Sequence, residues 1–221
     1  KKKNIIKIKK NEKNINTLAP YKLVKTMRAG VLVLGSLLTK YGKAKVSLPG
    51  GCAIGTRPID IHLEGLRKLG ANFQVENGYV LGEVEKQLIG NHIALPFPSV
   101  GATENIMMAA SIAKGKTTIE NAAREPEIND LAMALNKMGA KINFKNNGII
   151  KIDGVNSLSQ TSHKIMSDRI VAGTFVIAAV MLNKKFEVKD IESNHLEALT
   201  FSLTEMGAKL KIKKTSIQIM P

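Results

Sequence analysis

The single cysteine of this 221-residue chain, Cys52, lies in a glycine-rich segment that could carry chemistry. Gly50 and Gly51 precede it, Gly55 follows it, and Arg57 comes five positions after the thiol. A thiol in an accessible loop beside a guanidinium loses its proton more readily, or exchanges it with an anionic substrate. A lone cysteine is more often a buried and inert residue. The glycine-rich context favours a reactive thiol instead.

The starts of three apolar helices supply a second group of candidates. We expect these helices to begin near residues 26–28, 99–101 and 167–169. Helix N-termini offer unpaired N–H groups and partial positive charge, so three starts at one end of a domain would form an anion site. Arg28 and Arg57 would add full charges suited to carboxylate or phosphate. The alternatives are helix capping by Ser99 and Ser167 and a solvated position for Arg28.

Three copies of one unit would position these residues. A Leu-x-x-Leu/Met-Gly-Ala pattern places Gly70, Gly139 and Gly207 at intervals of 69 and 68 residues. In each copy the glycine ends an amphipathic helix and is followed by two short strands that form a hairpin. Each copy also contains a helix that is apolar on nearly every face, at 31–38, 106–113 and 175–182, and such helices are expected to be buried.

These patterns predict a mixed α/β (α+β) fold of three β-α-β-α-β-β units around buried helices. The units would span about 19–85, 86–157 and 158–221, after a basic leader at 1–18. Val46 aligns with Ile119 at an offset of 73, whereas Gly70 aligns with Gly139 at 69, so the first unit carries four extra residues. They fall in 49–58, around the cysteine. Since the other copies pack without them, we expect this loop to serve function.

The composition narrows the class of protein. A formal charge of +15 suggests nucleic-acid binding, but seven of the 33 basic residues lie in the first thirteen positions, and the chain has no Trp and three Tyr for base stacking. Four scattered histidines predict no metal site, and the apolar runs are shorter than the roughly 20 residues that span a bilayer. We expect a soluble, cytoplasmic protein without nucleic acid, metal or membrane span.

Residues 48–60, with the sequence Leu-Pro-Gly-Gly-Cys-Ala-Ile-Gly-Thr-Arg-Pro-Ile-Asp, resemble the cysteine loop of the UDP-N-acetylglucosamine 1-carboxyvinyltransferases, a family of enolpyruvyl transferases. Segments 25–29, 98–103, 120–128 and 167–170 also resemble that family in order and spacing, so the resemblance covers nearly all of the chain beyond residue 20. It implies two domains of three such units each, arranged as an inside-out α/β barrel, of which this chain would be one half.

The resemblance implies transfer of the enolpyruvyl group of phosphoenolpyruvate to the 3'-hydroxyl of UDP-N-acetylglucosamine, the first committed step of peptidoglycan synthesis. The reaction passes through a tetrahedral intermediate, releases phosphate and needs no cofactor. Cys52 would be the general acid, the thiol that forms an adduct with phosphoenolpyruvate and the target of fosfomycin, while Arg28 and Arg57 would hold anionic groups of the substrates. The expected UDP-sugar contacts are Pro58, Ile59, Asp60, Ile61, Pro98, Ser99, Val100 and Gly101.

The chain departs from the family in two respects. Phe97 stands where many members have lysine, so one charged contact to the nucleotide is expected to be missing. The family's other domain is the expected partner, and this half alone is expected to be inactive. Two alternatives stay open. The sister enzyme 5-enolpyruvylshikimate-3-phosphate synthase shares the fold but lacks the cysteine loop, and a non-catalytic module of the same fold would bind anions or nucleic acid with strong salt dependence.

Overall fold

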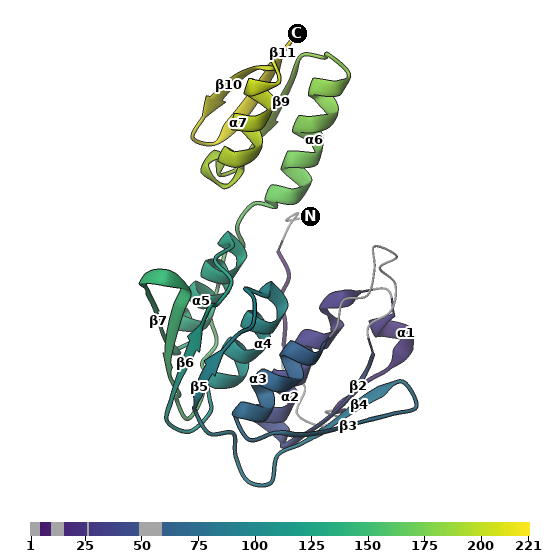
Figure 1. Ribbon diagram of the computed structural model, residues 1–221, viewed down its shortest axis with the longest axis vertical. Helices are drawn as coiled ribbons and strands as arrows, with labels where there is room; N and C mark the ends of the chain where they lie inside the picture. Colours follow the sequence, from purple (N-terminus) through teal and green to yellow (C-terminus); the bar gives the residue numbers. More distant parts are fainter. Residues whose placement is uncertain (1–4, 10–15, 26, 49–58) are drawn as a thin grey trace. The chain divides into compact units, whose positions relative to one another are not determined.

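The structure is a computed structural model that describes residues 5–9, 16–25, 27–48 and 59–221 (Figure 1). The chain divides into two compact units, Lys1–Ser162 and His163–Pro221, and each is described by itself. Both units combine helices with mainly antiparallel sheets. The predicted mixed α/β class is therefore confirmed.

The first unit contains two repeats with the same order of elements. The first repeat consists of β1 (Leu18–Ala19), α1 (Tyr21–Val24), the 3-10 helix η1 (Arg28–Leu32), α2 (Val33–Tyr41), β2 (Lys43–Ser47), α3 (Asp60–Lys68), β3 (Asn72–Glu76) and β4 (Tyr79–Glu83). The second consists of β5 (His92–Ala94), α4 (Val100–Ala110), β6 (Lys116–Glu120), α5 (Pro126–Lys137), β7 (Lys141–Lys145), η2 (Asn146–Gly148) and β8 (Ile149–Asp153).

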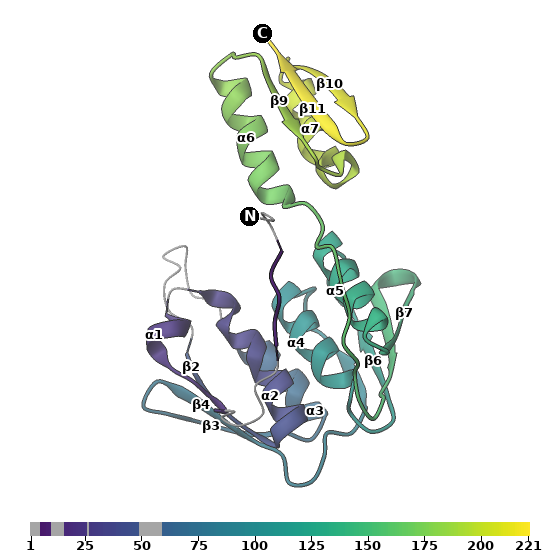
Figure 2. The same ribbon diagram turned by 180° about the vertical axis from the view of Figure 1, so that it is seen from behind.

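The two sheets have matching topology. Their strand orders are β1-β2-β4-β3 and β5-β6-β8-β7, with the opening strand parallel to its neighbour and the remaining pairs antiparallel. Helices α2, α3 and α4 lie between the two sheets (Figures 1 and 2). One hydrophobic cluster joins them, and its most deeply buried members include Leu34, Leu66, Ile106 and Ile119. The predicted burial is confirmed for the second apolar helix, 106–113, whereas in the first, 31–38, Val33 is 40% exposed and Ser36 is also exposed.

Close approach of these helices depends on small residues. At Gly35 of α2, a Cβ would lie 2.6 Å from the backbone oxygen of Asn105 and 3.2 Å from the Cβ of Ala109, both on α4. At Gly65 of α3, a Cβ would overlap the side chain of Ile106. Interiors are too tightly packed to absorb such contacts without movement. Gly35 and Ala109 therefore permit the close packing of α2 and α4.

The recurring glycines end the amphipathic helices as predicted. Gly70, Gly139 and Gly207 have φ values of 101°, 103° and 94°, a region that side chains other than glycine rarely adopt. The backbone then turns into a strand pair each time. Upstream of Gly70, the predicted face of α3 is buried, with Leu63 4% exposed and Leu66 fully buried.

The second unit contains the third repeat. Its elements are α6 (Arg169–Met181), β9 (Phe186–Lys189), η3 (Ser193–Leu196), α7 (Glu197–Glu205), β10 (Lys209–Lys213) and β11 (Ser216–Met220), with strand order β10-β11-β9. A separate hydrophobic cluster forms around Val176, Leu203 and Ile217. The sheet therefore has its own core.

The third repeat differs from the prediction at its start. Residues 154–168 are all described and contain no strand, so the opening strand of the β-α-β-α-β-β pattern is missing here. Residues 156–162, Asn-Ser-Leu-Ser-Gln-Thr-Ser, lack the alternating apolar residues that hold a strand against a core. Helix α6 also differs from the predicted all-round burial, because Val176 is buried whereas Phe175 and Met181 are 54% and 79% exposed.

Candidate substrate-binding site

The helix start predicted at residues 99–101 is confirmed, with Ser99 as the N-cap of α4. Ser99 precedes α4, and its side chain accepts a hydrogen bond from the backbone N–H of Ala102 at 3.4 Å. The backbone oxygen of Ser99 accepts from both the N–H and the hydroxyl of Thr103, at 2.9 and 2.8 Å. Ser99 therefore has the capping role considered from the sequence. Capping also fixes the first turn of α4, which carries Val100 and Gly101.

Helix α3 brings a buried histidine against this turn. The side chain of His62 faces Gly101, where a Cβ would lie 3.0 Å from Cε1 and 3.3 Å from Nε2 of the ring. Burial, followed by the positive charge of Arg28, lowers the pKa of His62 from 6.5 to about 4. The imidazole is therefore neutral near pH 7. Arg28 on η1, His62 on α3 and Gly101 on α4 converge at one end of the helix layer.

The other residues predicted to contact the UDP-sugar, at the start of α3 and just before α4, differ in their exposure. Ile59 is 8% exposed and belongs to the core, so its side chain supports the helix start, and its carbonyl accepts from the N–H of His62 at 2.9 Å. Asp60 and Pro98 are exposed, and Ile61 is half-buried. Phe97, at the position where the resemblance led us to expect the loss of a charged contact, is 54% exposed. Cys52, Arg57 and Pro58 lie outside the described residues.

The third predicted helix start belongs to the second unit. Asp168 caps α6, because its Oδ1 accepts from the N–H groups of Ile170 and Val171, both at 2.9 Å. Ser167 was the alternative capping residue from the sequence, and this expectation is wrong. Its hydroxyl instead accepts from the N–H of Glu192 at 3.2 Å. A carboxylate interacts more strongly than a hydroxyl with the positive end of a helix, which explains the choice.

Sequence analysis missed a buried amide that joins the converging elements. Asn105 of α4 is fully buried. Its Oδ1 accepts from the N–H of Gly35 at 2.8 Å, and its Nδ2 donates to the carbonyl of Val31 at 3.1 Å and lies 3.2 Å from Nδ1 of His62. An amide directly before the apolar run 106–110 of α4 was the available signal, because a buried polar group needs partners.

Three carboxyl groups gather beside the loop that enters α5. The pKa of Glu104 is raised, first by burial and then by the negative charges of Glu127 and Glu125. The loop is fixed to α4 by a hydrogen bond from the N–H of Ala123 to the hydroxyl of Thr103 at 3.1 Å. Like charges therefore accumulate at Glu104.

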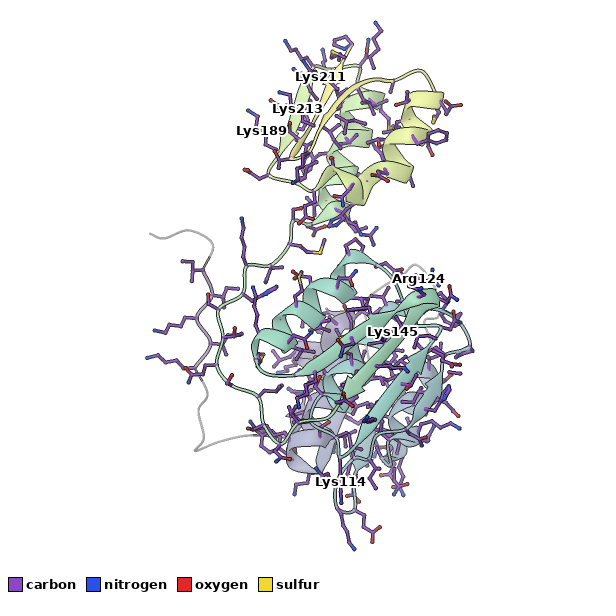
Figure 3. All side chains as sticks on the ribbon, turned by 90° about the vertical axis from the view of Figure 1, so that its left-hand side faces the viewer. Lys114, Arg124, Lys145, Lys189, Lys211 and Lys213 are labelled. Atoms are coloured by element: carbon purple, nitrogen blue, oxygen red, sulfur yellow. The ribbon has the colours of Figure 1, made fainter. Side chains whose placement is uncertain are left out.

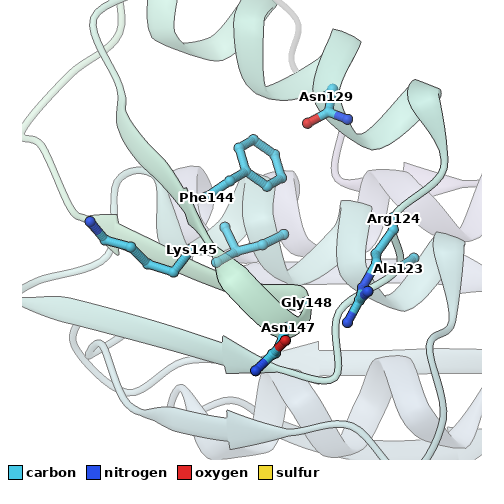
Figure 4. Close-up of a pocket in the computed structure, with 8 residues that line it drawn as sticks. Ala123, Arg124, Asn129, Phe144, Lys145, Asn147 and Gly148 are labelled. Carbon is cyan, nitrogen blue, oxygen red and sulfur yellow. The ribbon is translucent and has the colours of Figure 1, made fainter.

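A small pocket lies on the other side of that loop (Figure 4). It has a volume of ≈ 240 Å³, and its lining includes Arg124, Asn129, Phe144 and Lys145. Gly148 permits the approach of Arg124, since a Cβ there would lie 3.1 Å from its Nε. None of the described residues that we predicted for substrate binding lines this pocket. It is therefore distinct from the convergence of Arg28, His62 and Gly101.

The distribution of basic side chains, metal-ligating residues and apolar helices in the described part of the chain bears on the other candidate classes. Among the labelled basic residues, Lys145 lies on β7 and Lys211 on β10, while Lys114 lies between α4 and β6 (Figure 3). Within residues 5–9, 16–25, 27–48 and 59–221, no three His, Cys, Asp or Glu side chains gather to hold a metal ion. Over the same ranges, no helix combines the length and apolar character that a bilayer span requires.

Two solved structures share the fold of this chain and are each covered by it to about half of their length. The enolpyruvyl transferase NikO from Streptomyces tendae superposes with a TM-score of 0.79 over 93% of this chain and 50% of that chain, at 19% identity. EPSP synthase from Acinetobacter baumannii superposes with a TM-score of 0.66 over 89% of this chain and 46% of that chain, at 21% identity. These likenesses show the fold.

Sequence comparison identifies the family. Residues 1–220 match the family EPSP synthase (3-phosphoshikimate 1-carboxyvinyltransferase), and the chain belongs to it. UDP-N-acetylglucosamine 1-carboxyvinyltransferase of Pelagibacter ubique is 50% identical over 95% of this chain and 50% of its own length. The enzyme of the same name from Prochlorococcus marinus (strain AS9601) is 53% identical over 90% of this chain and 44% of its own length. The chain spans about half the length of the curated relatives it matches.

Proposed function

We propose that this chain is the cysteine-loop half of an enzyme that transfers the enolpyruvyl group of phosphoenolpyruvate to the 3'-hydroxyl of UDP-N-acetylglucosamine. The observation that carries the proposal is the identity of 50 to 53% with relatives of that name over 90 to 95% of the chain. Such an enzyme supplies peptidoglycan precursors and works in the cytoplasm without a metal or organic cofactor.

The converging helix starts supply the physical basis for binding an anionic UDP-sugar. The first turn of α4 carries partial positive charge, Gly101 lets the His62 ring pack against it, and Arg28 contributes a full charge from η1. His62 is neutral between them. In our proposal the UDP-sugar contacts residues 58–61 and 98–101, and Arg28 and Arg57 hold anionic groups of the two substrates.

Cys52 is the proposed general acid. Protonation of the methylene carbon of phosphoenolpyruvate makes the neighbouring carbon electrophilic, and the sugar hydroxyl adds there to give a tetrahedral intermediate. Loss of phosphate and of a proton then regenerates the double bond in the product. The thiol would also form the covalent adduct with phosphoenolpyruvate. A second domain, which completes the site in the proposed enzyme, is the proposed partner of this half.

The sister activity, transfer to shikimate 3-phosphate, is the second candidate because the matched family carries the name EPSP synthase. Residues 49–58, Pro-Gly-Gly-Cys-Ala-Ile-Gly-Thr-Arg-Pro, argue against it. They resemble the cysteine loop, which the sister enzyme is expected to lack. Separate assays with each acceptor substrate distinguish the two activities.

The test is phosphate release by the natural gene product that contains this sequence. It receives phosphoenolpyruvate with either UDP-N-acetylglucosamine or shikimate 3-phosphate. We expect release only with the UDP-sugar, and the 221-residue chain alone should release none. Release only with shikimate 3-phosphate would reassign the enzyme. If folded protein releases phosphate with neither substrate, the protein is better described as a binding module of the same fold.

A further inference from the structure

The orientation of the Asn105 amide is determined by its neighbours. The backbone N–H of Gly35 can only donate, so the atom that it contacts at 2.8 Å must be the amide oxygen. The amide nitrogen therefore faces the carbonyl of Val31 at 3.1 Å and the ring of His62. Val31 and Gly35 are four residues apart, the spacing of a helical hydrogen bond. Asn105 thus bridges α2 at the point where η1 passes into that helix.

This orientation determines the tautomer of His62. Nδ2 of Asn105 carries only hydrogens to donate, so Nδ1 of His62, 3.2 Å away, must accept. The proton of the neutral ring then resides on Nε2, the nitrogen that lies beside Gly101. If the ring were protonated, its Nδ1–H and the Nδ2–H of Asn105 would be two donors facing each other. Hydrogen bonding and burial therefore favour the same neutral form.

The pair connects the elements that carry the proposed binding residues. Val31 belongs to η1 together with Arg28, His62 follows Asp60 and Ile61 on the first turn of α3, and Asn105 lies one turn along α4 from Gly101. Both side chains of the pair are buried, at 7% and 0% exposure. A buried polar contact of this kind permits few geometries, because any shift leaves a donor or acceptor unpaired.

We propose that the buried His62–Asn105 pair positions the UDP-sugar half of the site, by holding Arg28, the start of α3 and the first turn of α4 in one fixed arrangement. His62 and Asn105 are positioning residues in this scheme. The proposal rests on the proposed function and adds a specific role for two residues beyond the predicted contacts. Its distinguishing element is the acceptor at Nδ1 of His62.

Two substitutions at one position isolate that acceptor. In His62→Asn, Oδ1 lies near the place of Nδ1 and can accept from Asn105, whereas in His62→Gln the polar group lies near the place of Nε2. Both variants remove the aromatic ring and share most of any loss from packing. His92→Asn is the matched control in the same unit, because His92 is exposed and paired only with Glu120 among the described ion pairs, at 3.2 Å.

The experiment uses the natural gene product and measures KM for UDP-N-acetylglucosamine, KM for phosphoenolpyruvate, kcat and the thermal midpoint. We expect His62→Gln to raise KM for the UDP-sugar about tenfold, equivalent to about 1.4 kcal/mol, within the range for an unpaired buried polar group. His62→Asn should recover most of that loss, and His92→Asn should match the wild type. A calorimetric Kd for UDP-N-acetylglucosamine should follow the same order.

The outcomes separate the inference from the function on which it rests. Equal KM values for the Asn and Gln variants, with any difference confined to the thermal midpoint, would show a purely structural role and overturn the positioning proposal. A wild-type protein that neither binds nor turns over UDP-N-acetylglucosamine would overturn the proposed function and this inference with it. Loss in His62→Gln with recovery in His62→Asn, in an active wild type, supports both.

Discussion

Lowering the pH from 7 to 5 should destabilise this chain through His62. The pKa of the buried ring is lowered from 6.5 to about 4, first by burial and second by the charge of Arg28. Between these two values the unfolded chain binds a proton that the folded chain does not. The contribution of neutral His62 to the free energy of unfolding is therefore fully present above pH 6.5 and is lost as the pH falls toward 4.

The size of the effect follows from the two pKa values. Integrating proton uptake from pH 7 to pH 5 gives a loss of about 2 kcal/mol from His62 alone, and about 3 kcal/mol once the pH is below both values. A loss of 2 kcal/mol is a large part of the stability of an ordinary domain. Other groups titrate in the same range, so the informative quantity is the difference between wild type and His62→Asn.

Urea denaturation of the 221-residue chain at pH 7, 6 and 5 measures that difference, and circular dichroism is the suitable signal because the chain has no tryptophan. The stability advantage of the wild type over His62→Asn should shrink by about 2 kcal/mol between pH 7 and pH 5. Parallel stability curves for the two proteins would refute the reasoning, as would an NMR titration of His62 with a midpoint near 6.5.

Three further predictions concern neighbouring residues. Gly101→Ala should destabilise the fold by about 1 to 3 kcal/mol in urea denaturation, because the new Cβ meets the His62 ring; a gain, as at an ordinary helical glycine, would contradict that contact. Glu104→Gln should raise the thermal midpoint at pH 8, because it removes a charge that burial and the neighbouring Glu127 and Glu125 disfavour. It should not raise the midpoint at pH 4, where the carboxyl with the raised pKa is already protonated. An unchanged midpoint at pH 8 would show that the charge of Glu104 does not destabilise the fold. Cys52→Ser in the natural gene product should abolish alkylation by fosfomycin, followed by mass spectrometry, and persistent labelling of the variant would assign the reactive thiol elsewhere.

Repetition made much of the fold predictable. Gly70, Gly139 and Gly207 each end an amphipathic helix with a positive φ. The hairpin predicted after Gly139 is formed by β7 and β8, which are joined at Asn146–Gly148 with Asn147 at φ 64°. Local backbone demands of this kind are visible in the sequence because few residue types satisfy them. The buried helix at 106–113 was also recognisable, since a helix without a polar face must be buried.

Contacts between distant residues could not be predicted from local patterns. Asn105 and His62 are 43 residues apart, and nothing in the neighbourhood of either one indicates the other. The cap of α6 shows the same limit on a smaller scale, because Ser167 and Asp168 are both good capping residues, and the structure shows that Asp168 is the cap. The missing opening strand of the third repeat reflects a polar segment that overrides the pattern of its siblings.

Asn105 also has a consequence for how two apolar helices select one alignment. Small and apolar residues recur along α4 and leucines along α2, so sliding α4 along α2 by one turn would retain much of the apolar contact. The amide of Asn105 meets a backbone donor and a backbone acceptor only at Gly35 and Val31, and a slide would leave all three groups buried and unpaired. A single polar side chain thereby excludes the alternative alignments that hydrophobic packing alone would tolerate.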